Sequence, residues 1–269
     1  RSRGLGDVYK RQVYVYDSVT SSEIQVITGS DSMMPSQYAS GDGFAATIKM
    51  TTDGSLLFVG APNAYDLLQG VRCGMVEVFA WDGAKYQWVQ RITSPVITND
   101  VSFGYDIAVS DDGTSLVITS VGNSISSSTT FDKYTQRLPL SVSTATYGSM
   151  YVNDSTSELN ASATTFDSGS ANFYSNIVSA GAAHTYIRHN GRWIYDQELF
   201  DSTVNSGCTF GQSVCSVGNS VFVGAPGMLP NGTDLGRVTQ FSKKTTGNSW
   251  YALRNQDPVV DLSLITRVM

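Results

Sequence analysis

The sequence predicts an all-β protein, and within that class a partial β-propeller. Three observations carry this prediction. Only 15% of the 269 residues are charged, against roughly 25% in ordinary globular domains. No stretch shows the i, i+3, i+4, i+7 apolar pattern of a long helix, and no run of 18 apolar residues could span a bilayer. A set of landmarks also recurs three times, and each repeat has room for four short strands.

The recurring landmarks keep the same spacing at several independent places. The three repeats start near Phe44, Phe103 and Phe210. Ten residues separate the phenylalanine from the glycine of a predicted turn in both of the first two repeats, at Gly54 and Gly113. A later glycine precedes an aromatic residue by five positions in all three: Gly74 to Phe79, Gly181 to Tyr186, and Gly236 to Phe241.

The first repeat divides into four strands in chain order. We expect strands at Ala46–Met50, Leu56–Val59, Met75–Trp81 and Tyr86–Ile92, with Asp53-Gly54 turning the chain between the first two. A four-stranded sheet of this kind has two apolar faces and covers neither by itself. Stacking such sheets radially buries both faces against neighbouring copies, which is the architecture of a propeller.

The predicted organisation follows the chain. Residues 13–258 form about three and a half blades, and 259–269 are the next blade's first strand, a ring-closing strand or the start of another domain. Within the propeller we expect a half blade at 13–30 and full blades at 41–95, 102–202 and 207–256.

The first twelve residues differ in character from the rest. Residues 1–12 resemble a translated sequencing-adapter tail of metagenomic origin; a genuine basic arm is the alternative. Four basic residues and one acidic residue give them a charge of +3, so the remaining chain carries −9 rather than the formal −6. We expect the chain to be an internal piece of a longer protein.

The second repeat contains a Ser/Thr-rich insertion. The step from Phe103 to Phe210 is 107 residues, whereas that from Phe44 to Phe103 is 59. The excess lies at about 122–175, between the second and third strands. Loops of this length are usually functional or disordered, so a decorating loop and a partner-binding loop are both open.

The segments Ser102–Leu116 and Val59–Pro62, with the Gly-x-Val strand that follows, resemble the FG-GAP repeats of integrin-α-like propellers. The resemblance implies a seven-bladed ring and extracellular or surface recognition. Many repeats of that family carry a calcium loop, and Ca²⁺ needs six to eight oxygen ligands. The turn at Ser110–Gly113 and its counterparts are too short to supply them, so we expect the calcium-free subtype and no cofactor.

The sequence predicts no catalytic, cofactor-binding or metal site, and leaves the binding site unknown. His184 and His189 are five apart on one strand or its turn, which places them on opposite faces. The carboxylates of Glu77, Asp106 and Glu198 are expected to be exposed surface charge, because no second group pairs with them in the sequence.

The three cysteines are an odd number without metal-type spacing. We expect Cys215 to be a buried thiol, because it occupies an apolar strand position. A Cys73–Cys208 disulfide is the alternative if the strand ends meet.

The leading functional hypothesis is a non-catalytic structural or interaction module that recognises a protein or a glycan at a cell or virion surface. The acidic charge argues against nucleic acid as a partner; we also expect no membrane insertion, an extracellular, cell-surface or virion location, and membership of a larger assembly. Two alternatives stay open: a phage virion tail or fibre protein, and a propeller-fold glycan hydrolase or lyase.

Overall fold

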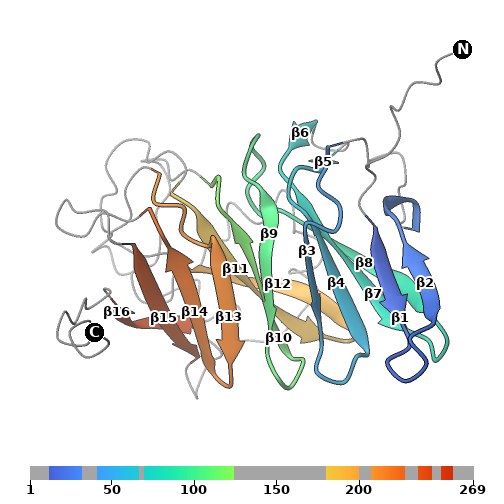
Figure 1. The fold of residues 1–269 in the computed structure, drawn as a ribbon. Helices are drawn as coiled ribbons and strands as arrows, with labels where there is room; N and C mark the ends of the chain where they lie inside the picture. Colours follow the sequence, from blue (N-terminus) through green and yellow to red (C-terminus); the bar gives the residue numbers. More distant parts are fainter. Residues whose placement is uncertain are drawn as a thin grey trace, which may run out of the picture.

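The computed structural model of the chain is built almost entirely of antiparallel β-sheets (Figure 1). Three sheets have four strands and two have two strands. The prediction of an all-β, partial propeller fold is confirmed. The structure describes residues 12–31, 41–66, 70–123, 180–199, 207–227, 236–243 and 250–256.

Blade 1 is a sheet of strands that are hydrogen-bonded in chain order, except for a small hairpin inserted between the second and third. Its strands are β3 (Thr47–Met50), β4 (Leu56–Ala61), β7 (Met75–Trp81) and β8 (Tyr86–Thr93). The inserted hairpin, which the sequence did not predict, consists of β5 (Tyr65–Asp66) and β6 (Val71–Arg72).

A two-stranded sheet precedes blade 1 and is called the half blade. It consists of β1 (Val13–Tyr16) and β2 (Glu23–Ile27), followed by the short 3-10 helix η1 (Gly29–Asp31). Val13 and Ile27 are buried in one cluster with residues of blade 1. Tyr14 and Tyr16 alternate with Val13 and point to the other face.

Blades 2 and 3 repeat the order of blade 1. Blade 2 contains β9 (Phe103–Val109), β10 (Ser115–Ser120), β11 (Ala182–His189) and β12 (Arg192–Leu199). Blade 3 contains β13 (Ser213–Val217), β14 (Ser220–Ala225), β15 (Arg237–Lys243) and β16 (Trp250–Gln256). The predicted insertion lies almost wholly outside the described residues.

The sheets stand side by side, with the first strands of successive blades closest to one another (Figure 1). The strand β9 contacts β3 and β4 of the preceding blade and β13 of the following blade. The fourth strands β8, β12 and β16 have fewer mutual contacts. The first strands are therefore the inner strands and the fourth strands the outer ones.

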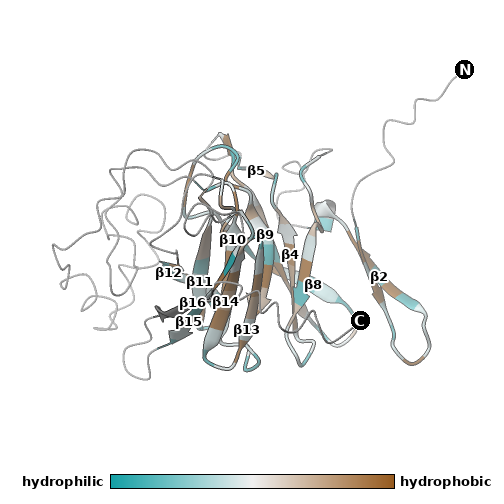
Figure 2. Cartoon of the chain, turned by 60° about the vertical axis from the view of Figure 1, so that its left-hand side comes forward, coloured by the Kyte–Doolittle hydropathy of each residue, from teal (hydrophilic) through white to brown (hydrophobic). Residues whose placement is uncertain are grey.

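The hydrophobic core lies between the sheets rather than within one of them, and hydrophobic segments run along the strands (Figure 2). One buried cluster joins the half blade to blade 1, a second joins blades 1 and 2, and a third joins blades 2 and 3. Each internal sheet thus buries side chains from both of its faces.

The glycine and phenylalanine landmarks meet at the blade boundaries. Gly74 forms a parallel bridge with Phe103, and Gly181 forms one with Phe210. The Phe103 amide donates to the Cys73 carbonyl at 2.8 Å. A Cβ on Gly74 would clash with the Phe103 backbone oxygen, and Gly74 has φ +84°. Only glycine fits there, which explains the regular spacing of the two landmarks.

A glutamine side chain links the outer strands at every boundary between described sheets. Gln90 of β8 donates through Nε2 to the Trp193 carbonyl and accepts from the Trp193 amide through Oε1, both at 2.8 Å. Gln25 binds the backbone of Tyr86 in the same two-fold manner, and Gln197 that of Trp250. We call this repeated contact the glutamine clamp.

The prediction of a buried Cys215 is wrong. Cys215 is exposed, because it lies on the face of blade 3 that no described sheet covers. Cys73 and Cys208 are buried free thiols and form no disulfide. Each lies near a different blade boundary, and the Cys208 thiol donates to the Ala180 carbonyl.

Candidate active site

A glycine precedes the third strand of each full blade: Gly74, Gly181 or Gly236. The residue three positions after this glycine is buried in every blade. Its cross-strand neighbour lies on the outer strand. In blade 1 the pair is Glu77 with Arg91. In blade 2 it is His184 with Glu198, and in blade 3 the buried residue at this place is Thr239. The same place in the fold therefore carries two different polar pairs, one in blade 1 and one in blade 2.

The pair of blade 1 is a satisfied ion pair. Arg91 donates to the Glu77 carboxylate through Nε at 2.7 Å and through its terminal nitrogen at 2.6 Å. The Trp88 indole N–H donates to the other carboxylate oxygen at 2.6 Å. Glu77 is completely buried. Its partners are what a buried carboxylate requires, so this pair has a structural role.

The pair of blade 2 belongs to a buried cluster of four polar residues: Ser120, Asn123, His184 and Glu198. The Ser120 hydroxyl lies 3.1 Å from His184 Nε2, and the donor depends on the imidazole tautomer. Asn123 donates through Nδ2 to the Glu198 carboxyl at 2.9 Å. Within the described part of the chain, Glu198 has no ion-pair partner.

Local structure holds these four side chains together. Ser120 ends β10, and its carbonyl accepts from the Asn123 amide in the turn that follows. The Asn123 carbonyl accepts from the Gly181 amide at 3.0 Å, which fixes this turn to the start of β11. His184 and Glu198 are direct cross-strand neighbours, so their side chains lie on one face. The cluster thus lies where residues 124–179 leave and rejoin blade 2.

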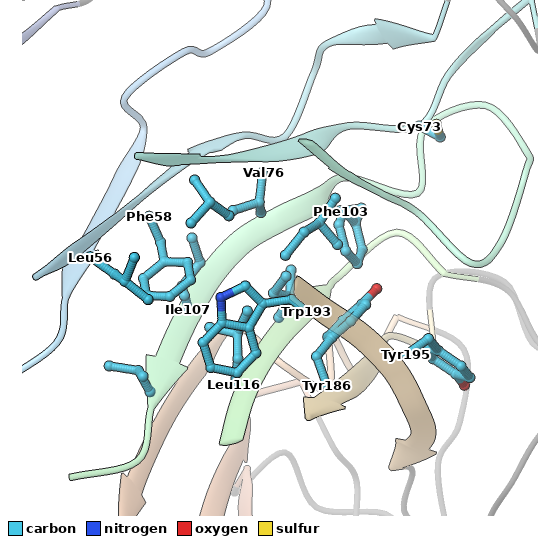
Figure 3. Close-up of a cluster of buried hydrophobic side chains, with 14 of the residues drawn as sticks. Leu56, Phe58, Cys73, Val76, Phe103, Ile107, Leu116, Tyr186, Trp193 and Tyr195 are labelled. Carbon is cyan, nitrogen blue, oxygen red and sulfur yellow. The ribbon is translucent and has the colours of Figure 1, made fainter. Parts of the chain in front are cut away.

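Aromatic rings surround the imidazole. The His184 ring centroid lies 5.7 Å from that of Phe103 and 6.3 Å from that of Tyr195. Phe103 and Tyr195 belong to the hydrophobic cluster between blades 1 and 2, together with Trp193 (Figure 3). The polar cluster therefore borders an apolar region of low dielectric constant.

Burial sets the protonation states of the two titratable groups. It raises the pKa of Glu198 to about 8, which the hydrogen bond from Asn123 partly opposes. It lowers the pKa of His184 to about 3. Both side chains are therefore uncharged at neutral pH.

Two polar atoms of the cluster are buried without a hydrogen-bond partner among the described residues: Asn123 Oδ1 and His184 Nδ1. Buried polar atoms are normally satisfied, and exceptions often mark functional sites or a missing ligand. A hydroxyl within hydrogen-bond reach of an imidazole is a candidate nucleophile, because the imidazole can take its proton. The cluster is therefore the candidate active site.

Sequence reasoning missed this site. The expectation that Glu77 and Glu198 are surface charges is wrong, since both are buried. Asp106 is partly buried, and its carboxylate accepts from the Val214 amide of blade 3 at 2.8 Å. His184 is buried, whereas His189 lies at the hairpin end of β11. Ser120 and Asn123 stand out in the sequence only by their place next to the insertion.

Two absences hold for the described part of the chain. No three His, Cys, Asp or Glu residues gather there in a group that could hold a metal ion. The same residues include no helix that is long and apolar enough to cross a membrane.

Comparison with solved structures finds propeller-type proteins. A proposed 6-phosphogluconolactonase of Bacteroides uniformis matches with a TM-score of 0.46 and 7% identity over 91% of this chain and 51% of that one. A proposed 6-phosphogluconolactonase of Bacteroides fragilis matches with a TM-score of 0.45 and 11% identity over 82% of this chain and 40% of that one. No family model and no curated protein matches the sequence.

A periplasmic gluconolactonase of Pseudomonas aeruginosa matches with a TM-score of 0.27 and 10% identity, over 91% of this chain and 78% of that protein. The chain spans about half or less of the length of the two Bacteroides proteins. Likeness at such identities and TM-scores assigns no activity to this chain.

These comparisons correct the main functional expectation. The neighbours with a stated activity include lactonases, which are enzymes, and none of these three proteins is an integrin-like, adhesion or virion protein. The non-catalytic interaction module and the virion alternative are therefore withdrawn.

Proposed function

We propose that the protein is a β-propeller hydrolase that cleaves ester bonds in carbohydrate derivatives, with Ser120 as nucleophile and His184 as base. The observation that carries the proposal is the 3.1 Å contact between the Ser120 hydroxyl and His184 Nε2, inside a buried cluster that also holds Glu198. A nucleophile and a base within hydrogen-bond reach are two of the parts that acyl transfer requires. Glu198 is the cross-strand neighbour of that base, and His184 Nδ1 has no hydrogen-bond partner among the described residues.

Each residue has a stated role in the reaction. His184 Nε2 takes the Ser120 proton while the hydroxyl oxygen attacks the carbonyl carbon of the ester. The carbon–oxygen ester bond then breaks, and the imidazolium returns the proton to the leaving alcohol oxygen. Water, deprotonated by the same imidazole, hydrolyses the acyl-serine and restores the hydroxyl. Glu198 stabilises the imidazolium that forms twice in the cycle.

This scheme predicts a rate that increases with pH. An uncharged His184 with a pKa near 3 is a weak base. Ionisation of Glu198, whose pKa is near 8, places a carboxylate beside the imidazole and raises its basicity. Hydrolysis should therefore increase as the pH passes through about 8.

The substrate class follows from the groups around the dyad. The free amide oxygen of Asn123 can accept a hydrogen bond from a hydroxyl group. The rings of Phe103 and Tyr195 offer apolar surface next to it. A sugar presents hydroxyls at its edge and C–H groups on its faces. O-acyl sugars and sugar-acid lactones combine this recognition surface with an ester bond.

A fluorophosphonate probe tests the proposal, because it modifies an activated serine covalently. We expect the probe to label Ser120, identified by mass spectrometry of the peptide, and Ser120→Ala to abolish labelling and to lower ester hydrolysis by at least about 10³-fold. Ser115→Ala is the matched control, a buried serine on the same strand. A protein that is unlabelled at Ser120, or a Ser120→Ala variant with full activity, would refute the proposal.

Two further expectations stay proposals. The Phe-Gly and Gly-x-Val landmarks support assignment of the repeats to the FG-GAP type, in a calcium-free form, although the comparisons support only the propeller fold. An extracellular location and a larger assembly are compatible with the low charge and the repeat architecture.

A further inference from the structure

Asp100 departs from the pattern of the repeat. Three residues before the landmark phenylalanine, the backbone is left-handed in every full blade, with φ of +100°, +63° and +76° in blades 1, 2 and 3. Blades 1 and 3 have glycine at this position, Gly41 and Gly207, whereas blade 2 has Asp100. Glycine adopts this conformation without steric cost, and a residue with a Cβ does not. The architecture of the repeat therefore does not require the strain at Asp100.

The Asp100 carboxylate forms no hydrogen bond that offsets this strain. Aspartate tolerates a positive φ mainly where its short side chain binds nearby backbone. Asp53 and Asp112 do this in the hairpin turns of blades 1 and 2, where each carboxylate accepts from an amide two residues further on. Among the described residues, the exposed carboxylate of Asp100 has no such hydrogen bond and no ion pair. A residue held in a strained conformation without a structural reason is a candidate for a functional role.

Asp100 lies beside the candidate active site. A Cβ on Gly122 would clash with the Asp100 carbonyl oxygen, so the two backbones are in close contact. The carbonyl of the next residue, Val101, accepts from the Gly122 amide at 3.0 Å. Gly122 directly precedes Asn123 of the polar cluster. Exposure decreases along this path, from exposed Asp100 through half-buried Gly122 to buried Asn123. Asp100 is therefore the surface residue next to the cluster.

The hairpin β5–β6 brings an exposed aromatic residue to the same region. The Asp100 amide donates to the Arg72 carbonyl at 2.8 Å, and the Arg72 amide donates to Asn99 Oδ1 at 2.9 Å. Tyr65 is the cross-strand partner of Arg72 and is 40% exposed. A carboxylate can accept hydrogen bonds from two hydroxyls of a sugar, and an aromatic ring can cover its C–H face. Asp100 and Tyr65 supply one group of each kind.

We propose that Asp100 is a specificity-determining residue, whose carboxylate binds hydroxyl groups of a neutral sugar while the ester bond of that sugar reaches Ser120. The inference rests on the proposed function and extends it, because it names the group that selects the sugar. A neutral sugar is preferred because a second negative charge next to this carboxylate would be repelled. The strained conformation of Asp100 is then retained for binding, at a position where the other blades have glycine.

Asp100→Gly tests the proposal, because it restores the residue of the other blades. The ratio of kcat/KM for 6-O-acetylglucose to kcat/KM for 4-nitrophenyl acetate, which has no sugar, should fall at least about tenfold through a higher KM for the sugar ester. Urea denaturation should show a variant at least as stable as the wild type. Ser102→Gly is the matched control, since it relieves a φ of +57° two residues away and should leave the ratio unchanged. Asp100→Asn keeps the shape without the charge and should give an intermediate ratio.

Binding without turnover separates this inference from the proposed function. In the Ser120→Ala variant, NMR titration with 6-O-acetylglucose should give a Kd that increases at least about tenfold when Asp100→Gly is added. A wild-type chain that fluorophosphonate leaves unlabelled refutes the proposed function, and the titration then still decides the role of Asp100. The inference is overturned if 6-O-acetylglucose does not bind, or if Asp100→Gly leaves the Kd unchanged. An equal increase of the Kd in Ser102→Gly overturns it as well, because the conformation of the loop rather than the carboxylate would then be the cause.

Discussion

Replacing Glu198 with glutamine should change how the free energy of unfolding depends on pH. Glu198 is buried, and its hydrogen-bond partner Asn123 is neutral. Burial raises its pKa from 4.5 to about 8. Between these values the unfolded chain releases a proton that the folded protein keeps. The free energy of unfolding therefore decreases as the pH rises through this window, by about 1.4 kcal/mol per pH unit.

His184 contributes with the opposite sign in a lower window. Its pKa falls from 6.5 to about 3 on folding, so stability is lost as the pH falls from 6.5 toward 3. The two slopes cancel between pH 4.5 and 6.5, and the contribution of Glu198 alone remains between 6.5 and 8. We expect the wild-type chain to lose about 2 kcal/mol over that upper interval.

Glutamine resembles the protonated glutamate in shape and does not titrate. The free energy of unfolding of Glu198→Gln minus that of the wild type should therefore increase by about 5 kcal/mol between pH 4.5 and 8. Urea denaturation followed by circular dichroism measures this difference, and Asp111→Asn, at an exposed carboxylate, is the matched control. A difference that stays constant across this range would show that the Glu198 carboxyl is solvated or paired, and the electrostatic reasoning would fail.

Three further substitutions test contacts between blades and within blade 1. Gly74→Ala should lower the free energy of unfolding by at least about 3 kcal/mol more than Gly83→Ala does. Both glycines have positive φ, but only a methyl group at Gly74 would clash with backbone atoms. Equal losses of unfolding free energy in urea denaturation would contradict this. Gln90→Ala should cost about 1–3 kcal/mol, since it leaves both backbone groups of Trp193 without the clamp. The control is Gln87→Ala on the same strand, where the side chain binds Asp82 at the surface. It should change the free energy of unfolding by less than about 0.5 kcal/mol. Similar shifts of the melting temperature for Gln90→Ala and Gln87→Ala would contradict a stabilising role of the clamp. Arg91→Leu should lower the free energy of unfolding by about 3–5 kcal/mol, because it leaves Glu77 buried without its cation. Adding Glu77→Gln should recover part of that loss. A double-mutant cycle that shows no coupling between the two positions would contradict this.

The fold could be predicted from the sequence because the repeat fixes both the strands and their neighbours. Gly74 lies in the first blade and Phe103 at the start of the second, yet the two are in contact at the boundary. This contact requires a glycine and a phenylalanine at each boundary, so the two residues recur at regular places in the sequence. The short hairpin β5–β6 left no such trace, because each of its strands has only two residues and so shows no apolar alternation.

The site could not be predicted, because an alternation of apolar and polar residues along a strand was interpreted as one buried face and one exposed face. The polar residues were therefore expected at the surface. Glu77 alternates with Val76 and Val78, a pattern typical of a half-exposed strand. In this fold both faces of an internal sheet are covered, so both sets of side chains are buried. For Cys215 the error has the opposite direction: it was expected to be buried and is exposed, because it lies on a face that no described sheet covers. Burial here depends on the neighbouring blade, which local sequence does not encode.

The equivalent pairs of blades 1 and 2 allow the chemistry to be separated from the architecture. Replacing His184 with glutamate and Glu198 with arginine places the ion pair of Glu77 and Arg91 in blade 2, at the same cross-strand positions. The two opposite charges balance each other, as they do in blade 1. We expect the double variant to fold, with circular dichroism like that of the wild type, and to lose fluorophosphonate labelling of Ser120, because no imidazole remains to accept the hydroxyl proton. Undiminished labelling of a folded double variant would mean that His184 does not activate Ser120. Loss of the fold would mean that the pairs are not interchangeable, and that the polar cluster serves stability in blade 2 as the ion pair does in blade 1.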